Sequence, residues 1–241
     1  MQNPSIQAWL QERQYATAYH WRQRPNDERE YQLRTRVVLD LAGLAPMREG
    51  SRGTNDARGT GDARPQLLDI GCGDGRFTAD AARLSNAVGV DVSRRALGFA
   101  RDLVPDAHFV ASGGAALPLK TESVDIVTLL DVIEHISDGD ERRVIDEARR
   151  VLRPGGRLVV STNTDRSARE WKHYRHYSLA RFRSLFDGFT EIRLAGLIPY
   201  FPTLRFWMAS PIVWRFVRAR VRTCDPAVAQ VVIGAGRKCR D

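Results

Sequence analysis

Residues 67–77 read Leu-Leu-Asp-Ile-Gly-Cys-Gly-Asp-Gly-Arg-Phe, and this stretch decides the fold. An apolar run ends, glycine then recurs at every second position, and a segment compatible with a helix begins near Arg76. Such a pattern predicts a buried parallel strand that leads through a tight turn into a helix. Glycine lets the chain turn sharply and lets a ligand come close to the backbone. The free amide groups at the start of the helix would point at that ligand.

A second acid follows at the spacing of a nucleotide site. Residues 86–92 read Asn-Ala-Val-Gly-Val-Asp-Val, which predicts a short apolar strand that ends at Asp91. A carboxylate about 20 residues after such a turn can accept hydrogen bonds from both hydroxyls of a ribose. We therefore expect Asp91 to bind a ribose. Ser93 is the expected N-cap of a helix over residues 94–103.

The glycine turn resembles the first motif of class I S-adenosylmethionine-dependent methyltransferases, acid-x-Gly-x-Gly-x-Gly, which is filled here by Asp69, Gly71, Gly73 and Gly75. Three later stretches resemble the same family in the same order: residues 109–119, the apolar run 123–130, and residues 147–160 with their Pro-Gly-Gly turn. The resemblance implies S-adenosylmethionine as cofactor. It also implies an α/β fold with a Rossmann-like, doubly wound sheet of seven strands, mostly parallel, with an antiparallel last strand.

Carried over to this sequence, the resemblance implies further cofactor contacts. The family's third-strand acid, which commonly meets the adenine, is replaced here by Gly113, so Ser112 or backbone groups near Gly114 must hold the adenine edge. Asp131 falls at the mouth of the pocket, and Cys72 is a small filler beside the ligand. The expected cofactor-binding residues are Asp69, Gly71, Cys72, Gly73, Gly75, Asp91, Val92, Ser112, Gly113, Gly114 and Asp131.

A dinucleotide site is the alternative interpretation of the glycines. The phosphate-binding pattern Gly-x-Gly-x-x-Gly requires its last glycine where this chain has Arg76. Asp74 would also lie beside a pyrophosphate, where a negative charge is unfavourable. A sulfonium ligand is positively charged and favours nearby acids. We therefore expect S-adenosylmethionine and not NAD.

The composition is compatible with a single domain, since 241 residues with 43% hydrophobic side chains can fill one core. We expect a helical N-terminal cap over residues 1–45, with helices near 5–19 and 27–44, and a methyltransferase core over 66–241. Residues 46–65 have almost no apolar side chains, which predicts a flexible insert. The expected later elements are a helix over 178–186, a strand over 189–198 and a last strand over 227–236.

Three cysteines without paired spacing indicate free thiols in a reducing compartment and no zinc site. We also expect no bound metal. The start of the chain shows no secretory pattern, so we expect a cytoplasmic protein.

Positive charge is concentrated after residue 164, where Lys and Arg outnumber Asp and Glu by 15 to 6. Within this part, segment 201–222 alternates arginines with tryptophans and phenylalanines. One interpretation is a helix packed on the sheet with a solvated arginine face. The other is an amphipathic helix that makes peripheral contact with a membrane and guides a lipid-linked acceptor to the site. Nucleic acid is disfavoured as a partner.

Two stretches are candidates for the acceptor side. Asp131, Glu134 and His135 have the spacing i, i+3, i+4 and would share one side of a helical turn. Similar runs occur in small-molecule methyltransferases, including those of ubiquinone biosynthesis. His135 could be a general base, the trio could bind a divalent ion, or His135 could be structural.

The second stretch, residues 173–178, reads His-Tyr-Arg-His-Tyr-Ser and resembles one found before the fifth helix of relatives that modify sugars, lipids or quinones. His176 and Tyr174 could face the acceptor, or the stretch could be a cap and lid only. Ser178 is the expected cap of the next helix.

These observations predict a methyltransferase that acts on an oxygen of a small molecule, sugar or lipid-linked intermediate, with His135 and His176 as catalytic candidates. It would resemble the ubiquinone, menaquinone, sugar and lipid methyltransferases. Two alternatives stay open. One is an N-methyltransferase of an anionic lipid or nucleic acid, and the other is a cofactor-binding subunit without catalysis. The sequence does not identify the acceptor.

Overall fold

The computed structural model describes residues 12–13, 15–22, 25–44, 64–167, 173–199 and 223–240. The expected insert lies outside these residues except for its last two positions, and segment 201–222 lies wholly outside them. Among the helices of this described part, none is long and apolar enough to span a membrane.

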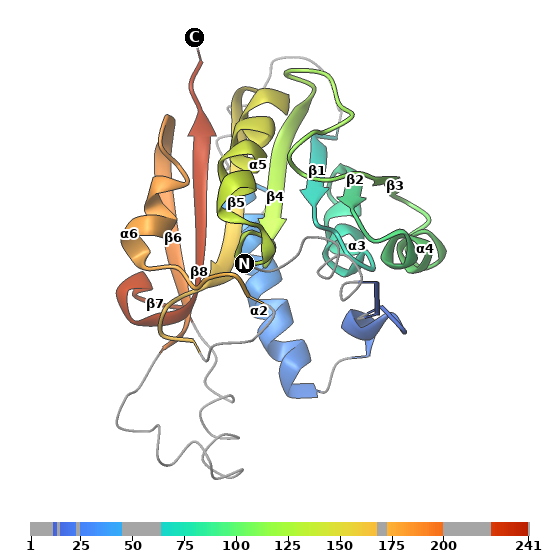
Figure 1. Cartoon of the computed structure of the whole chain (residues 1–241), viewed down its shortest axis with the longest axis horizontal. Coiled ribbons are helices and arrows are strands. Elements are labelled where there is room, and N and C mark those ends of the chain that lie inside the picture. Colours follow the sequence, from blue (N-terminus) through green and yellow to red (C-terminus); the bar gives the residue numbers. More distant parts are fainter. Residues whose placement is uncertain are drawn as a thin grey trace, which may run out of the picture.

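The described strands form one sheet. They are β1 (Gln66–Ile70), β2 (Asn86–Asp91), β3 (His108–Ala111), β4 (Val124–Leu130), β5 (Leu152–Asn163), β6 (Phe189–Pro199), β7 (Thr223–Cys224) and β8 (Ala229–Lys238). Their order across the sheet is β3-β2-β1-β4-β5-β8-β6-β7 (Figure 1). The first five strands pair in parallel: β1 with β2 and β4, β2 with β3, and β4 with β5. Strand β8 lies antiparallel between β5 and β6, and β7 pairs antiparallel with β6.

The predicted fold class is confirmed, with one correction to the number of strands. The expected antiparallel pair of last strands is present, because Leu197 of β6 pairs with Val231 of β8. The described sheet, however, has eight strands and not seven. The additional strand is β7, which pairs with Gly196 and Leu197 at the edge of the sheet. Two residues are too short to produce a hydrophobic alternation, so the sequence carries no signal for this strand.

The described helices cover the sheet. They are α2 (Pro25–Ala42), α3 (Arg76–Ala82), α4 (Arg94–Leu103), α5 (Asp138–Val151) and α6 (Leu179–Ser184), with 3-10 turns η1 (Tyr19–Trp21), η2 (Ile133–His135) and η4 (Pro226–Val228). Both predicted caps are confirmed. Ser93 Oγ accepts from the amide of Ala96 at 3.1 Å, and Ser178 Oγ accepts from the amide of Arg181 at 3.2 Å. The helix expected near 5–19 is not continuous in its described part, since residues 15–18 form turns and a bend before η1.

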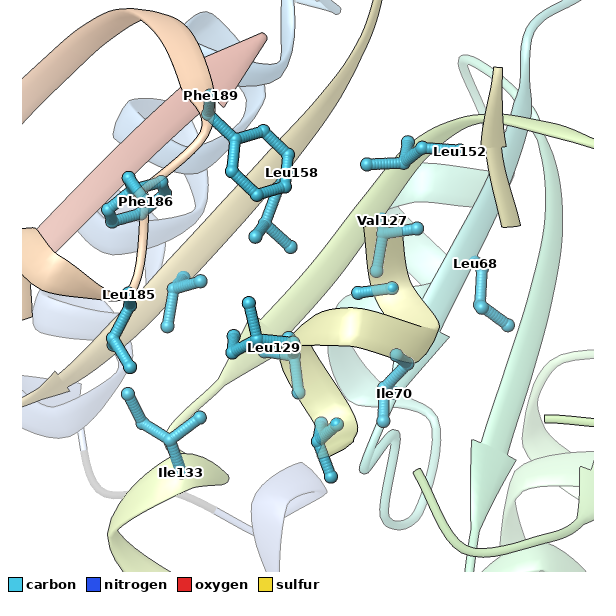
Figure 2. Close-up of a cluster of buried hydrophobic side chains, with 14 of the residues drawn as sticks. Leu68, Ile70, Val127, Leu129, Ile133, Leu152, Leu158, Leu185, Phe186 and Phe189 are labelled. Carbon is cyan, nitrogen blue, oxygen red and sulfur yellow. The ribbon is translucent and has the colours of Figure 1, made fainter. Parts of the chain in front are cut away.

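Successive side chains of the strands point to opposite faces, and each face has its own core. Leu68 of β1 belongs to one cluster with Ile145 of α5, with Phe182 of α6 and with Phe186, which follows α6. Figure 2 shows part of this cluster, including Leu68 and Phe186. The neighbouring Leu67 packs on the other face with Val38 of α2 and other residues of α2 and α3. This two-sided burial explains why the strands read as continuous apolar runs.

The strand order reverses between β1 and β4. From β1 the chain builds β2 and β3 toward one edge, and then returns to place β4 and β5 on the other side. The connections that leave β1 and β4 therefore go to opposite faces, which opens a crevice at the carboxyl ends of these strands. The glycine turn, Asp91 and Asp131 all lie at this end.

Candidate active site

The turn after β1 has the backbone conformation that glycine permits. Gly71, Gly73 and Gly75 all have left-handed φ angles, between 54° and 79°. A Cβ atom at Gly73 would lie 2.4 Å from the hydroxyl oxygen of Tyr15, and one at Gly71 would lie 2.4 Å from Val132. Both the φ angles and the close neighbours therefore exclude larger side chains here.

Asp69 lies at the end of β1, just before the glycine turn, and connects β1 to α3 and β4. Its buried carboxylate accepts hydrogen bonds from Thr78 Oγ1 at 2.7 Å and from Thr128 Oγ1 at 2.8 Å. Burial raises the pKa of Asp69 to about 6, and the nearby Asp91 adds to that rise. A positive charge on a bound ligand would stabilise the ionised form.

Asp91 ties the second strand to the glycine turn. Its carboxylate accepts from the amide of Gly73 at 2.9 Å and from the amide of Ser93 at 2.8 Å. Burial raises the pKa of Asp91 as well. Each carboxylate oxygen has a further lone pair, so the group can still accept from a diol.

A cavity of about 720 Å³ lies over these strand ends. Most of the expected cofactor residues line it: Asp69, Gly71, Cys72, Gly73, Asp91, Val92, Ser112, Gly114 and Asp131. Two do not. Gly75 packs against Ala100 and Phe109 at the start of α3, and Gly113 lies just outside the lining. Ser112 donates to backbone carbonyls of its own loop, so its side chain fixes the loop.

The N-terminal segment covers the glycine turn, and the sequence analysis gave it no role in the site. The buried carboxylate of Asp74 accepts a hydrogen bond from the backbone amide of His20 at 3.1 Å. The same carboxylate lies 2.9 Å from the Nδ1 atom of His20. Trp21 Nε1 donates to the carbonyl of Asp74 at 3.0 Å. Tyr15 and Tyr19 line the cavity above the turn. The cluster of aromatic residues in this segment is the feature of the sequence that could have indicated its place at the site.

Arg34 of helix α2 also lies at the site, and the sequence did not predict this. Arg34 donates to the carboxylate of Asp131, which in addition accepts from Ser161 Oγ at 3.0 Å. Arg34 also pairs with Glu30 at 3.5 Å, and all three charged residues line the cavity. Asp131 has a φ of 55° and lies before the helical turn η2.

The structure does not bring Asp131, Glu134 and His135 together as the spacing predicted. Asp131 is engaged by Arg34, whereas Glu134 is fully buried and His135 lines the cavity. His173 joins the last two. Glu134, His135 and His173 each offer one ligand atom, and these atoms lie within 4.8 Å of one another. Such a set could hold a metal ion.

His176 lies behind His173 and does not line the cavity. Its Nε2 is 3.0 Å from Nδ1 of His173, and the rings of His173 and His135 meet edge to face at 4.7 Å between centroids. Tyr174, from the same stretch, does line the cavity, and its amide donates to the carbonyl of Glu134 at 2.8 Å.

Comparison with known proteins shows what the middle of the chain is similar to. Residues 68–160 match the family described as a methyltransferase domain. The 27-O-demethylrifamycin SV methyltransferase of Amycolatopsis mediterranei is 33% identical over 134 residues, which are 52% of this chain and 43% of that protein. The ubiquinone biosynthesis O-methyltransferase of Cupriavidus pinatubonensis is 35% identical over 113 residues, 42% of this chain and 43% of that protein. The chain thus spans less than half the length of these relatives.

A solved structure agrees over almost the whole chain. The N-methyltransferase NodS of Bradyrhizobium japonicum, in complex with S-adenosyl-L-homocysteine, has a TM-score of 0.63 at 20% identity. The match covers 96% of this chain and 98% of that one. At this identity the likeness shows the fold.

Proposed function

We propose that this chain is an S-adenosylmethionine-dependent methyltransferase that modifies a hydroxyl oxygen of a small molecule, and the match of residues 68–160 to the methyltransferase domain family supports this. One observation carries the proposal: a single cavity joins the glycine turn and Asp91 at one end to His135 at the other. The name of the ubiquinone relative states O-methylation, which supports oxygen as the acceptor atom.

The cavity residues suggest how the cofactor lies. Asp91 would accept hydrogen bonds from the ribose hydroxyls, Val92 and Ser112 would hold the adenine, and the glycine turn would hold the amino-acid tail. The sulfonium and ammonium groups are positive, and the carboxylates of Asp69, Asp91 and Asp131 favour such charges. Cys72 stays a filler, because burial raises the pKa of its thiol well above the usual range and keeps it protonated.

Methyl transfer is an in-line displacement. A bond forms between the acceptor oxygen and the methyl carbon, the bond from that carbon to sulfur breaks, and the electron pair stays on sulfur. The enzyme mainly aligns the two reactants. The hydroxyl proton must leave toward the acceptor end, where His135 lines the cavity. His176 acts on this end through its hydrogen bond to His173.

Finer parts of the proposal rest on the charge distribution. A sugar or lipid-linked acceptor, and a membrane contact through segment 201–222, would fit the excess of Lys and Arg after residue 164. That segment lies outside the described residues.

Labelled methyl transfer tests the function. The purified chain is incubated with S-adenosylmethionine labelled on its methyl group and with fractions of a cell extract, and Asp91→Ala serves as the inactive control. We expect label in a small-molecule fraction, on an acid-stable, oxygen-bound methyl group. Label found only in RNA or in anionic lipid would instead support the N-methyltransferase alternative. No label in any fraction, despite cofactor binding, would support a subunit without catalysis.

A further inference from the structure

Three of the five histidines of the chain lie close together, and one of them, His135, lines the cavity. His135 belongs to η2, and His173 and His176 come from the stretch before α6. The ring of His173 lies between the other two, with centroid distances of 4.7 Å to His135 and 5.2 Å to His176. Beside them is Glu134, whose exposed fraction is 0%. Imidazoles and a carboxylate form a set of donors typical of transition-metal sites.

The carboxylate of Glu134 is held in place by β5. Thr162 Oγ1 donates to Oε2 at 3.0 Å, and Asn163 Nδ2 donates to Oε1 at 3.5 Å. These two bonds fix the orientation of the fully buried carboxylate, and its negative charge would attract a cation bound beside it.

His173 is oriented by an outer partner. Its Nδ1 is 3.0 Å from Nε2 of His176, so a metal ion would bind to the other ring nitrogen of His173, Nε2. Histidines that bind metals are commonly held in this way, with the second ring nitrogen hydrogen-bonded to a neighbouring group.

We propose that Glu134, His135 and His173 bind one divalent transition-metal ion, with His176 as the outer partner of His173. Two imidazoles and one carboxylate suit Zn²⁺ and its neighbours among the first-row metals, whereas Mg²⁺ prefers oxygen ligands. In a tetrahedral site with bonds near 2.1 Å, ligand atoms lie about 3.4 Å apart. The present atoms, within 4.8 Å, therefore close by about 1 Å around the ion. His135 and His173 are only half-buried, so their side chains have room to move.

The role of this ion rests on the proposed function. With three protein ligands, an ion keeps a coordination position open, and His135 places that position at the cavity. An acceptor hydroxyl bound there becomes more acidic and releases its proton to water before its oxygen attacks the methyl group. Asp131, which the spacing predicts as a partner of Glu134 and His135, bonds to Arg34 instead.

Metal titration of the tag-free, chelator-treated full chain tests the proposal without an acceptor. Calorimetry with Zn²⁺ should show one saturable site, Co²⁺ should give visible absorption bands at the same stoichiometry, and Mg²⁺ should not compete. His173→Ala should weaken Zn²⁺ binding by about 100-fold or more, and His176→Gln by about 10-fold to 100-fold. His108→Ala is the matched control, because this exposed histidine lies on β3 and should leave Zn²⁺ binding unchanged.

S-Adenosylhomocysteine binding by the same variants reports whether each is folded, and it separates this proposal from the proposed function. A chain that binds the cofactor product but shows no saturable Zn²⁺ site would overturn the metal site alone. Equal Zn²⁺ affinity in wild-type protein and folded His173→Ala would also overturn it.

Discussion

The carboxylate of Asp91 accepts a hydrogen bond from the amide of Gly73 at 2.9 Å, although 18 positions separate them. The residue expected to bind the ribose therefore also holds the glycine turn. On the proposed function, Asp91 would couple cofactor binding to the shape of that turn.

This coupling makes Asp91→Ala costly for the cofactor. The change removes the acceptor for the ribose hydroxyls and leaves the Gly73 amide without this partner. We expect the affinity for S-adenosylhomocysteine to fall by about 1–3 kcal/mol, the range for charged hydrogen bonds and unpaired groups. Calorimetry measures it, with Asp102→Ala on the exposed side of α4 as the control. Unchanged affinity would remove Asp91 from the ribose site.

Gly73→Ala should damage the turn directly. The residue has a φ of 54°, and a Cβ would lie 2.4 Å from the Tyr15 hydroxyl. The strained backbone costs about 1–2 kcal/mol, and Tyr15 must also move, so affinity for S-adenosylhomocysteine should fall clearly. Gly98→Ala is the opposite control. Nothing lies within 4 Å of a Cβ there, and alanine in this helix should stabilise the fold by up to about 1 kcal/mol. Equal behaviour of the two variants would contradict the close approach of Tyr15.

The raised pKa of Asp69 predicts a pH dependence of stability. Burial brings this pKa to about 6, from an ordinary value near 4 in the unfolded chain. The folded state therefore binds the proton more tightly. The resulting stabilisation is complete below about pH 4, is lost as pH rises through about 6, and amounts to about 3 kcal/mol.

Asp69→Asn should remove that part of the pH dependence. Urea unfolding at pH 4 and pH 7.5 measures the free energy of unfolding of both proteins, and the difference between the two pH values should be smaller in the variant. If the profiles of wild-type and variant run parallel, Asp69 does not titrate as the structure indicates.

His135→Ala should separate chemistry from cofactor binding. Loss of His135 should lower kcat by about 100-fold or more, both if it accepts the acceptor proton and if it binds the ion that makes the hydroxyl more acidic. S-Adenosylhomocysteine affinity should change little. The assay is labelled methyl transfer to the acceptor fraction found in the screen, and His108→Ala serves as the control. Full activity in His135→Ala would place the proton transfer elsewhere.

The parts of the fold that depend on local pattern could be predicted from the sequence. The glycine turn, the helix over 94–103 and the caps at Ser93 and Ser178 are set by residues close together in the chain. The last strand, β8, was predicted from its apolar run, and its antiparallel direction was predicted from the family resemblance. Strand β7 was missed, since Thr223 and Cys224 show no pattern and pair only because β6 lies beside them.

The rest of the site depends on contacts that no spacing reveals. Arg34 meets Asp131 across 97 positions, and His20 meets Asp74 across 54. The helical spacing of Asp131 and Glu134 suggested a shared side. Asp131 instead lies before η2 with a positive φ, and its carboxylate accepts from Arg34. His173 enters the cluster only because its stretch bonds to η2, for example through the Tyr174 amide.

Calorimetric titration of the wild-type chain with S-adenosylhomocysteine and, separately, with NADH tests the central claim most directly. The glycine turn with Arg76 in the sixth place, Asp74 beside it and Asp91 at the end of β2 predict saturable 1:1 binding of S-adenosylhomocysteine and no binding of NADH. Saturable binding of NADH, with none of S-adenosylhomocysteine, would contradict the claim that the cavity is built for a methyl donor.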